Sequence, residues 1–255
     1  MKISIITISF NSEATIEETI KSVIHQNYLD LEYIIIDGGS TDKTIEIINK
    51  YKNNIACFIS EPDKGIADAF NKGIKRATGE IIGIINSDDK LFNNALNVVK
   101  NNFHVDSDIL YGNLLILGKE SRSLSIKYPK NNIEVIKYEM INTIYHPSTF
   151  IRKNAYVKYG LYDINCKSAM DWELLLRMYV SGAKFQYCNS TLACFRLGGF
   201  SGNDNGLGLK EGREFCKKYK GNIVAIYYFY YKNELKRRVW INLNKAELLK
   251  KFLLK

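Results

Sequence analysis

The sequence predicts an α/β fold of Rossmann-like type, in which a mainly parallel sheet has helices on both faces and is followed by a helical extension. Two observations lead to this prediction. In residues 1–110, short apolar runs alternate four times with segments of helical periodicity. Alternation at this spacing requires crossover connections, which join parallel strands. Hydrophobic residues make up 46% and charged residues 25% of the 255 residues, the mix of an ordinary globular protein.

The first four strand–helix pairs are predicted from apolar runs and from the polar residues that begin helices. Asn11-Ser12 and Ser40-Thr41-Asp42 precede helical patterns that end near residues 26 and 51. Serine, threonine, asparagine and aspartate are favoured helix caps. The expected strands are 3–8, 32–36, 56–59 and 81–85, and the last two expected helices are 66–76 and 91–103.

After residue 110 the rhythm changes and strands dominate. Apolar side chains from Trp172 to Tyr179 recur at helical spacing and predict a helix over 171–181. From residue 210 the pattern is helical to the end of the sequence. The expected strands are 109–117, 123–128, 148–151, 184–187 and 191–195. The expected organisation is one domain over 1–209, with halves 1–110 and 111–209, and a basic amphipathic helical tail over 210–255.

The net charge of +9 is concentrated in the tail. Residues 1–209 contain 23 basic and 23 acidic side chains, whereas residues 210–255 contain 13 basic and 4 acidic ones. An aromatic run over 223–231 precedes an apolar stripe from Leu235 to Leu253, which suits the interface of an anionic membrane. The alternative is a helix packed on the domain or on a second subunit, as in a homodimer. The longest apolar run is about half a membrane span.

The cysteines favour a reducing compartment. The sequence has five of them, without a CxxC motif or a Cys/His spacing typical of metal sites. The apolar run near the N-terminus is too short for a signal peptide. These features predict free thiols in a cytoplasmic protein.

Polar, small and acidic residues gather in four loops that follow the predicted strands. In open α/β sheets, ligands bind beyond the carboxyl ends of the strands, so these loops are predicted to form a binding site. No GxGxxG occurs in the sequence, which argues against a nicotinamide dinucleotide. The loops are 7–11, 37–42, 61–68 and 86–89.

Asp88-Asp89 directly follows an apolar strand. Two adjacent carboxylates there can hold a hard cation such as Mg²⁺ or Mn²⁺, which would neutralise a diphosphate leaving group. The alternative is a helix N-cap. Asp37 ends the second apolar run, where it can accept a hydrogen bond from a base or ribose, or take part in a turn with Gly38-Gly39.

Four further polar residues also have two interpretations each. Asp63 can contact a ligand or cap the following helix, and Asp68 can point into the cleft or into solvent. His146 precedes Pro147 in a loop, where it can serve a site or only pack. Asp171 begins a helix, where it is either a partner of the helix dipole or a general base.

Four motifs follow one another along the first half of the chain. They are SVIHQNY at 22–28, EYIIIDGGSTD at 32–42, EPDKG at 61–65 and NSDD at 86–89. In this order they resemble glycosyltransferase family 2, whose members are inverting, nucleotide-sugar-dependent enzymes of the GT-A fold. The resemblance covers about residues 1–200 and is closest to bacterial members that build exopolysaccharide, capsule or O-antigen units.

The resemblance implies a role for each candidate residue. It places Thr7, Ser9, Asn11 and Asp37 at the nucleotide, Asp63 and Asp68 at the base, ribose or sugar, Asn86 and Asp88 at the nucleotide-sugar, Asp88 and Asp89 at the metal, Asp171 at the catalytic base, and His146, Trp172 and Arg196 near the acceptor.

The implied reaction is metal-dependent, inverting transfer of one sugar from a UDP-hexose or UDP-N-acetylhexosamine to a saccharide linked to polyprenyl diphosphate. The enzyme would be peripheral on the inner face of the bacterial cytoplasmic membrane. Asn86 stands where the family motif often begins with Asp, which leaves the choice between Mn²⁺ and Mg²⁺ open. Arg238-Val239-Trp240 does not match the QxxRW element of processive synthases, which implies single-sugar transfer.

Two other classes compete with an active transferase. Asn86 suggests a catalytically idle partner that binds a sugar nucleotide. The basic tail and its tyrosines suggest a nucleic-acid-binding module, since cations with aromatic side chains can follow a single strand. No RRM, KH or zinc pattern occurs in the sequence, and a nucleic-acid partner leaves the four acidic loops unexplained. We therefore expect no nucleic-acid partner.

Overall fold

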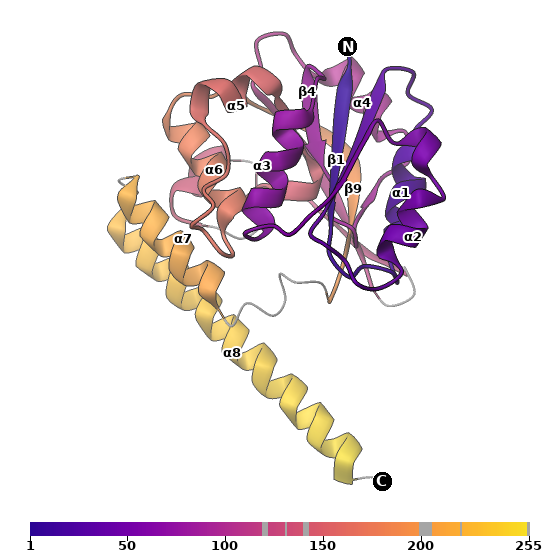
Figure 1. The fold of residues 1–255 in the computed structure, drawn as a ribbon. Helices are drawn as coiled ribbons and strands as arrows, with labels where there is room; N and C mark the ends of the chain where they lie inside the picture. Colours follow the sequence, from indigo (N-terminus) through magenta and orange to yellow (C-terminus); the bar gives the residue numbers. More distant parts are fainter. Residues whose placement is uncertain (119–121, 131, 140–142, 199–205, 220, 254–255) are drawn as a thin grey trace.

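Nine strands form a single sheet in the described part of this computed structural model (Figure 1). The structure describes residues 1–118, 122–130, 132–139, 143–198, 206–219 and 221–253, with side chains to residue 239. The strand order is β3-β2-β1-β4-β8-β6-β9-β5, and β7 pairs with β6 outside this path. The strands are β1 (Ile3–Ser9), β2 (Leu31–Asp37), β3 (Cys57–Ser60), β4 (Ile81–Ile84), β5 (Lys90–Leu91), β6 (Ile109–Leu117), β7 (Ser123–Lys127), β8 (Thr149–Arg152) and β9 (Phe185–Arg196).

The first four strands pair in parallel, as the alternating pattern predicts. Ser9 of β1 pairs with Asp37 of β2, and Asp37 pairs with Ser60 of β3, so the polar ends of three strands lie side by side. This register brings the loops that follow these strands to one edge of the sheet. The connecting helices are α1 (Ile16–Ile24), α2 (Thr44–Asn49) and α3 (Ile66–Arg76).

The helix predicted over 91–103 is shorter than expected. Residues Lys90–Leu91 form β5, which pairs antiparallel with β9, and the side chain of Leu91 is buried. Asn94 has a left-handed backbone with φ 60°, and α4 (Ala95–Asn102) begins after it. A strand of two residues is too short to leave a periodic pattern in the sequence. Its pairing partner lies about a hundred residues away, so the neighbouring sequence does not indicate it either.

The two strands predicted over 184–187 and 191–195 are one strand, β9. The polar residues 189–190 between them are accommodated where the pairing of β9 with β6 shifts register. Asn113 of β6 donates a hydrogen bond from Nδ2 to Asn189 Oδ1 at 3.2 Å. The polar side chains therefore pair across the sheet, and the strand continues.

The second half of the chain extends the sheet with antiparallel pairing. β8 lies antiparallel between β4 and β6, so the boundary predicted at residue 110 falls inside β6, within a continuous sheet. The sequence did not predict α5, whose seven residues include few buried apolar side chains. The elements here are α5 (Lys153–Tyr159), α6 (Met170–Val180) and the short helices η3 (Ile133–Lys137) and η4 (His146–Ser148), and η1 (Lys52–Asn54) precedes β3.

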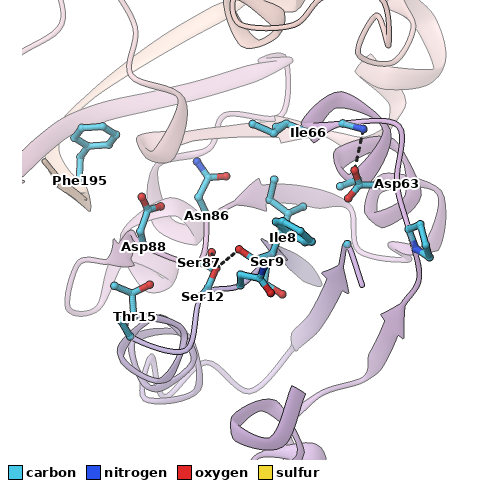
Figure 2. Close-up of a pocket in the computed structure, with 17 residues that line it drawn as sticks. Ile8, Ser9, Ser12, Thr15, Asp63, Ile66, Asn86, Ser87, Asp88 and Phe195 are labelled. Atoms are coloured by element: carbon cyan, nitrogen blue, oxygen red, sulfur yellow. Dashed lines mark hydrogen bonds between the residues drawn. The ribbon is translucent and has the colours of Figure 1, made fainter. Parts of the chain in front are cut away.

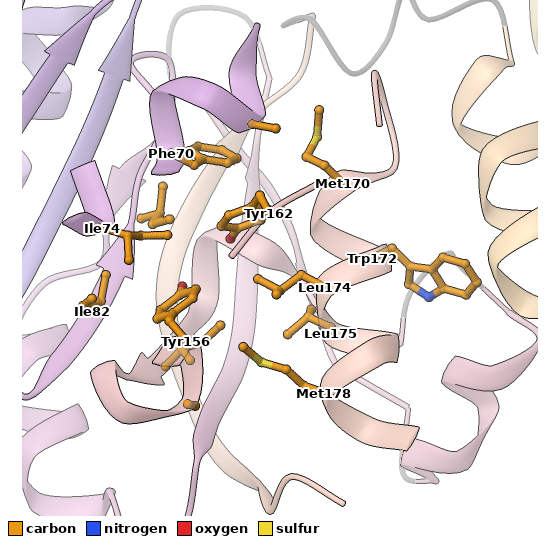
Figure 3. Close-up of a cluster of buried hydrophobic side chains, with 14 of the residues drawn as sticks. Phe70, Ile74, Ile82, Tyr156, Tyr162, Met170, Trp172, Leu174, Leu175 and Met178 are labelled. Carbon is orange, nitrogen blue, oxygen red and sulfur yellow. The ribbon is translucent and has the colours of Figure 1, made fainter. Parts of the chain in front are cut away.

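Buried side chains form one cluster on each face of the sheet. Ile3 and Ile5 of β1 pack with α1 and α4 on one face, whereas Ile6 packs with α3 and α6 on the other (Figure 3). Successive side chains of a strand point to opposite faces, so a strand covered on both faces needs an almost continuous apolar run. This requirement explains why the runs in residues 1–110 were easy to recognise.

The C-terminal part of the chain forms a pair of helices. α7 (Leu207–Lys218) packs against α6, and α8 (Ile223–Leu253) lies along α7 and continues beyond it (Figure 1). The chain turns at Gly221, where a Cβ would collide with the carbonyl oxygen of Lys137. The predicted boundary at residue 209 falls inside α7. Side chains of the predicted stripe from Leu243 to Leu253 lie outside the described residues.

Within the described residues, no helix is both long enough and apolar enough to span a bilayer.

Candidate active site

A cavity of about 600 Å³ lies at the carboxyl edge of the parallel strands (Figure 2). Its walls come from the loops that follow β1, β2, β3 and β4 and from the start of α3, with Phe195 contributed by β9. This is the edge at which ligands bind in open α/β sheets. The lining residues are Ile8, Ser9, Phe10, Asn11, Ser12, Ala14, Thr15, Gly38, Pro62, Asp63, Gly65, Ile66, Ala69, Asn86, Ser87, Asp88 and Phe195.

Five of the predicted nucleotide-sugar residues line this cavity, namely Ser9, Asn11, Asp63, Asn86 and Asp88. Asp63 and Asp88 lie on opposite sides of it in Figure 2. Residues from all four predicted loops therefore contribute to the wall of this one cavity.

The loop after β1 is held by side-chain bonds to the loop after β2. Asn11 has a left-handed backbone with φ 46°, and its Oδ1 accepts a hydrogen bond from the Thr41 N–H at 2.9 Å. The Asn11 N–H donates to Ser40 Oγ at 2.8 Å. These bonds fix the position of Asn11 in the cavity wall.

Thr7 and Asp37 lie beneath the cavity and do not form part of its lining. Both are fully buried, and Tyr33 donates a hydrogen bond to Thr7 Oγ1 at 3.1 Å. The Asp37 carboxylate accepts hydrogen bonds from three hydroxyls and two backbone N–H groups. Asp37 thus organises the loops that bear the lining residues. Its donors are Ser9 Oγ, Ser40 Oγ, Ser60 Oγ and the N–H groups of Gly39 and Ser40.

Asp63 and Asp68 have different surroundings. Asp63 lines the cavity, and its Oδ1 accepts a hydrogen bond from the Gly65 N–H at 2.8 Å. Asp68 lies in the first turn of α3, outside the lining. Its carboxylate accepts a hydrogen bond from the Lys64 N–H at 3.0 Å and lies 3.6 Å from Lys72 Nζ. The structure therefore brings only Asp63 to the cavity wall.

The Asn86–Asp89 loop places two carboxylates in a poorly solvated position. Asp88 lines the cavity and Asp89 is 1% exposed. Burial raises the pKa of Asp88, against the opposing charge of Arg196. Burial and the charge of Asp88 raise the pKa of Asp89 well above its ordinary value. The described residues offer no hydrogen-bond partner to the buried oxygens Asn86 Oδ1 and Asp89 Oδ2.

Arg196, predicted near the acceptor, lies beside this loop. Its backbone N–H donates to Asp89 Oδ1 at 3.1 Å, and its Nε donates to the Asp88 carbonyl oxygen at 3.2 Å. Its Nη2 contacts Glu18 of α1 at 3.0 Å, and Lys90 contacts the same carboxylate at 3.0 Å. Arg196 therefore connects the aspartates to α1.

Asp171 lies at the start of α6, outside the cavity lining. Its Oδ1 accepts a hydrogen bond from the Trp172 N–H at 2.7 Å. His146 Nε2 lies 2.9 Å from Tyr162 Oη, and the His146 ring packs on Phe70, with centroids 5.1 Å apart. Burial lowers the pKa of His146, and the nearby charge of Asp171 opposes this shift. The structure thus brings Asp171 and His146 into one cluster.

Trp172 has a packing role. It is 6% exposed and belongs to the buried cluster of α6 shown in Figure 3. Adjacent positions on a helix face different directions, so the side chain of Trp172 is buried whereas that of Asp171 is partly exposed.

Sequence reasoning missed several residues of the cavity wall. Ser12 Oγ and Ser87 Oγ lie 2.7 Å apart and connect the loops after β1 and β4. Phe10 is 62% exposed although it is apolar, and Phe195 faces Asp88 from β9. An apolar residue within a polar strand-end loop was the available signal for Phe10. The resemblance placed the adjacent Arg196 near the acceptor, but it did not place Phe195 beside the loop after β4.

Comparisons with known proteins agree with this geometry. The family model described as Glycosyl transferase family 2 matches residues 4–160. The chain is 26% identical over 206 residues to a PGL/p-HBAD biosynthesis glycosyltransferase of Mycobacterium bovis, covering 78% of each. It is 29% identical over 181 residues to an uncharacterized glycosyltransferase of Mycobacterium tuberculosis, covering 69% of this chain and 68% of that protein.

Solved structures share the fold. Residues 1–349 of S. aureus TarS in complex with UDP-GlcNAc match with a TM-score of 0.66 and 18% identity, over 90% of this chain and 71% of that one. The mannosyltransferase PcManGT of Pyrobaculum calidifontis, in complex with GDP-Man and Mn²⁺, matches with a TM-score of 0.67 and 17% identity. That match covers 87% of this chain and 65% of the mannosyltransferase, which is therefore longer.

Proposed function

The chain belongs to glycosyltransferase family 2 and is a glycosyltransferase, and from this premise we propose that it transfers one sugar from a nucleotide-sugar to a hydroxyl of a saccharide acceptor, with inversion. The observation that carries the proposal is the cavity of about 600 Å³ at the carboxyl edge of the sheet, with Asp63 and Asp88 in its walls. Small-molecule sites commonly have volumes of about 300–1,000 Å³.

The proposed donor is a UDP-hexose or UDP-N-acetylhexosamine. Similar folds hold UDP-GlcNAc, UDP and GDP-Man in their solved complexes. In this chain the exposed ring of Phe10 offers a stacking face for a base. Asp63, whose carboxylate lies beside Gly38 as the Phe10 ring does, offers hydrogen-bond acceptors to base or ribose donors.

Mn²⁺ or Mg²⁺ is proposed as the cofactor, held by Asp88 and Asp89. The fit rests on the two unpartnered buried oxygens, Asn86 Oδ1 and Asp89 Oδ2, because such oxygens are costly without a donor or cation. When bound, the cation would stabilise negative charge on the leaving diphosphate. Among the described residues there is no group of three or more His, Cys, Asp or Glu side chains suited to a metal ion. Diphosphate and water oxygens are therefore expected to supply the other ligands.

Asp171 is the proposed general base. Its carboxylate accepts the proton of the acceptor hydroxyl while that oxygen forms a bond to the anomeric carbon. The bond from this carbon to the diphosphate breaks on the opposite face, and the configuration inverts. Ala69 of α3 lines the cavity, and its neighbour Phe70 packs on His146, so α3 links the cavity to the Asp171 cluster.

The proposed acceptor is a saccharide linked to polyprenyl diphosphate, in the synthesis of a surface polysaccharide such as capsule or O-antigen. The resemblance of the four motifs supports this choice, and the site of action would be the inner face of the cytoplasmic membrane. Single-sugar transfer is proposed because the QxxRW element does not occur in the sequence.

A donor panel tests the proposal. Purified protein is mixed with UDP-, GDP- and dTDP-sugars and Mn²⁺, and both the thermal shift and the release of nucleotide are measured. We expect one nucleotide class to raise the Tm and to be hydrolysed slowly without acceptor. A thermal shift without hydrolysis or transfer would instead favour a catalytically idle binding partner. The absence of a shift with every sugar nucleotide would refute donor binding.

A further inference from the structure

One face of α8 carries large apolar side chains that no other described residue covers. Val224, Tyr228, Tyr231, Leu235 and Val239 are each exposed by half or more. Their spacing of three and four residues places them on one side of the helix. We call these five residues the apolar stripe.

Other residues of α8 make its packing contacts. Ile226 and Asn233 are buried. Phe229 stacks on Tyr138, with ring centroids 5.4 Å apart, and the Arg213 guanidinium of α7 lies 4.5 Å from the centroid of Tyr230. The apolar stripe is therefore not required to attach α8 to the rest of the protein.

Cations flank the apolar stripe. Lys232, Lys236 and Arg238 are exposed on the same stretch of α8, and Lys232 Nζ lies 5.5 Å from the ring centroid of Tyr228. Helices that lie in a membrane interface combine apolar side chains, tyrosine rings and long basic side chains in this way.

We propose that the apolar stripe and its flanking cations bind a bilayer that contains anionic lipid, with α8 lying along the surface. The spacing of the stripe also suits a coiled coil with a second copy of this chain. Residues 210–255 hold 13 basic and 4 acidic side chains, so two copies would bring like charges together, whereas an anionic surface attracts them. The inference is independent of the donor, because none of the described side chains of α8, which end at residue 239, belongs to the cavity lining.

Co-sedimentation of the whole chain with vesicles tests this proposal. Vesicles of equal parts phosphatidylglycerol and phosphatidylcholine should bind the protein, pure phosphatidylcholine should bind it much less, and added NaCl should weaken binding. Lys232→Ala and Lys236→Ala should each lower the partition coefficient about fivefold. Val224→Asp combined with Leu235→Asp should remove binding, because two carboxylates would face the lipid.

The matched control is Val157→Asp combined with Leu29→Asp. These residues are of the same types, are 80% and 104% exposed, and lie on α5 and before β2. The control should bind vesicles as the unchanged protein does, with circular dichroism confirming that both double variants fold. Equal loss in the two double variants would overturn the proposal. The proposal would also be overturned if light scattering showed that the unchanged protein is a dimer and the Val224→Asp, Leu235→Asp variant a monomer, and neither protein bound vesicles.

Discussion

The backbone N–H of Arg196 donates a hydrogen bond to Asp89 Oδ1 at 3.1 Å, which ties the end of β9 to the loop after β4. Leu91 of β5 pairs with Ala193 of β9, and this pairing brings the two segments together. Thr19 Oγ1 of α1 also donates to the Asp89 carbonyl oxygen at 2.7 Å. The aspartate loop is thus positioned by α1 and by the second half of the chain.

Asp88→Asn should weaken Mn²⁺-supported binding of UDP by more than about tenfold, since even groups outside the ligand shell contribute that much to metal affinity. The fold should be unaffected, because asparagine has nearly the same size and burial already disfavours the charged form of Asp88. Isothermal titration calorimetry with UDP, with and without Mn²⁺, measures the effect.

Asp30→Asn is the control for this substitution. Asp30 precedes β2 at the opposite edge of the sheet, where its exposed carboxylate lies 3.6 Å from the N-terminal ammonium. The control should bind UDP and Mn²⁺ like the unchanged protein. Unchanged affinity in Asp88→Asn would remove Asp88 from the metal site.

Asp171→Asn should preserve nucleotide-sugar binding and lower the transfer rate by at least about a hundredfold, the usual contribution of a general base. Asparagine can still accept the 2.7 Å hydrogen bond from the Trp172 N–H, so α6 should still begin at the same residue. Single-turnover transfer and donor binding are measured on the same sample. Near-normal turnover would show that another group accepts the proton.

Glu211 of α7 accepts hydrogen bonds from three consecutive backbone N–H groups, those of residues 167–169, at 2.9–3.0 Å. These groups directly precede α6 and Asp171. Glu211→Gln should lower the free energy of unfolding by about 2 kcal/mol, because both carboxylate oxygens accept these bonds, whereas glutamine keeps one acceptor oxygen and its NH₂ group cannot accept from an N–H. It should also lower kcat for transfer more than it raises the donor KM, because the segment that bears Asp171 loosens.

Glu214→Gln is the matched control on the same helix. Glu214 is exposed and pairs only at the surface, with Arg213 and Lys217. Its replacement should change stability by less than about 1 kcal/mol and leave kcat unchanged. Thermal unfolding and transfer assays are run on both variants. Equal effects of the two substitutions would show that Glu211 has no special role in positioning α6.

The sequence predicted the parallel half of the sheet well because its strands are buried on both faces. Residues 33–36 of β2 are all at most 1% exposed, so the strand required a continuous apolar run. β5 and α5 had no comparable signal, since β5 depends on a partner about a hundred residues away. The continuity of β9 depends on the cross-strand pair of Asn113 and Asn189, which a single sequence cannot reveal.

The site was predicted at the level of loops more than of side chains. The carboxyl-edge rule located the cavity through Asn11, Asp63 and Asp88. The rule could not show that the Asp37 carboxylate accepts hydrogen bonds from the surrounding loops instead of lining the cavity. A residue at the end of a strand can do either. Trp172 illustrates the same limit on a helix, where burial decides between contact and packing.

Glu32 is the second residue of β2, at the edge of the sheet opposite the cavity, and it is 8% exposed. Its carboxylate accepts hydrogen bonds from Lys2 Nζ, from Ser4 Oγ and from both the N–H and the hydroxyl of Thr78. Burial by itself raises the pKa of Glu32, but these hydrogen bonds outweigh it and lower the pKa to about 2.

A carboxyl whose pKa is depressed in the folded state stabilises the fold above its unfolded pKa, and this contribution is lost as the pH falls from 4.5 towards about 2. Glu32→Gln should therefore lower the free energy of unfolding by about 3 kcal/mol at neutral pH and by much less near pH 3. Urea denaturation at several pH values measures this difference, with Glu46→Gln on the exposed face of α2 as the control. The control should show no such trend. A stability difference for Glu32→Gln that does not change with pH would mean that packing, rather than the carboxylate's hydrogen bonds, explains its contribution.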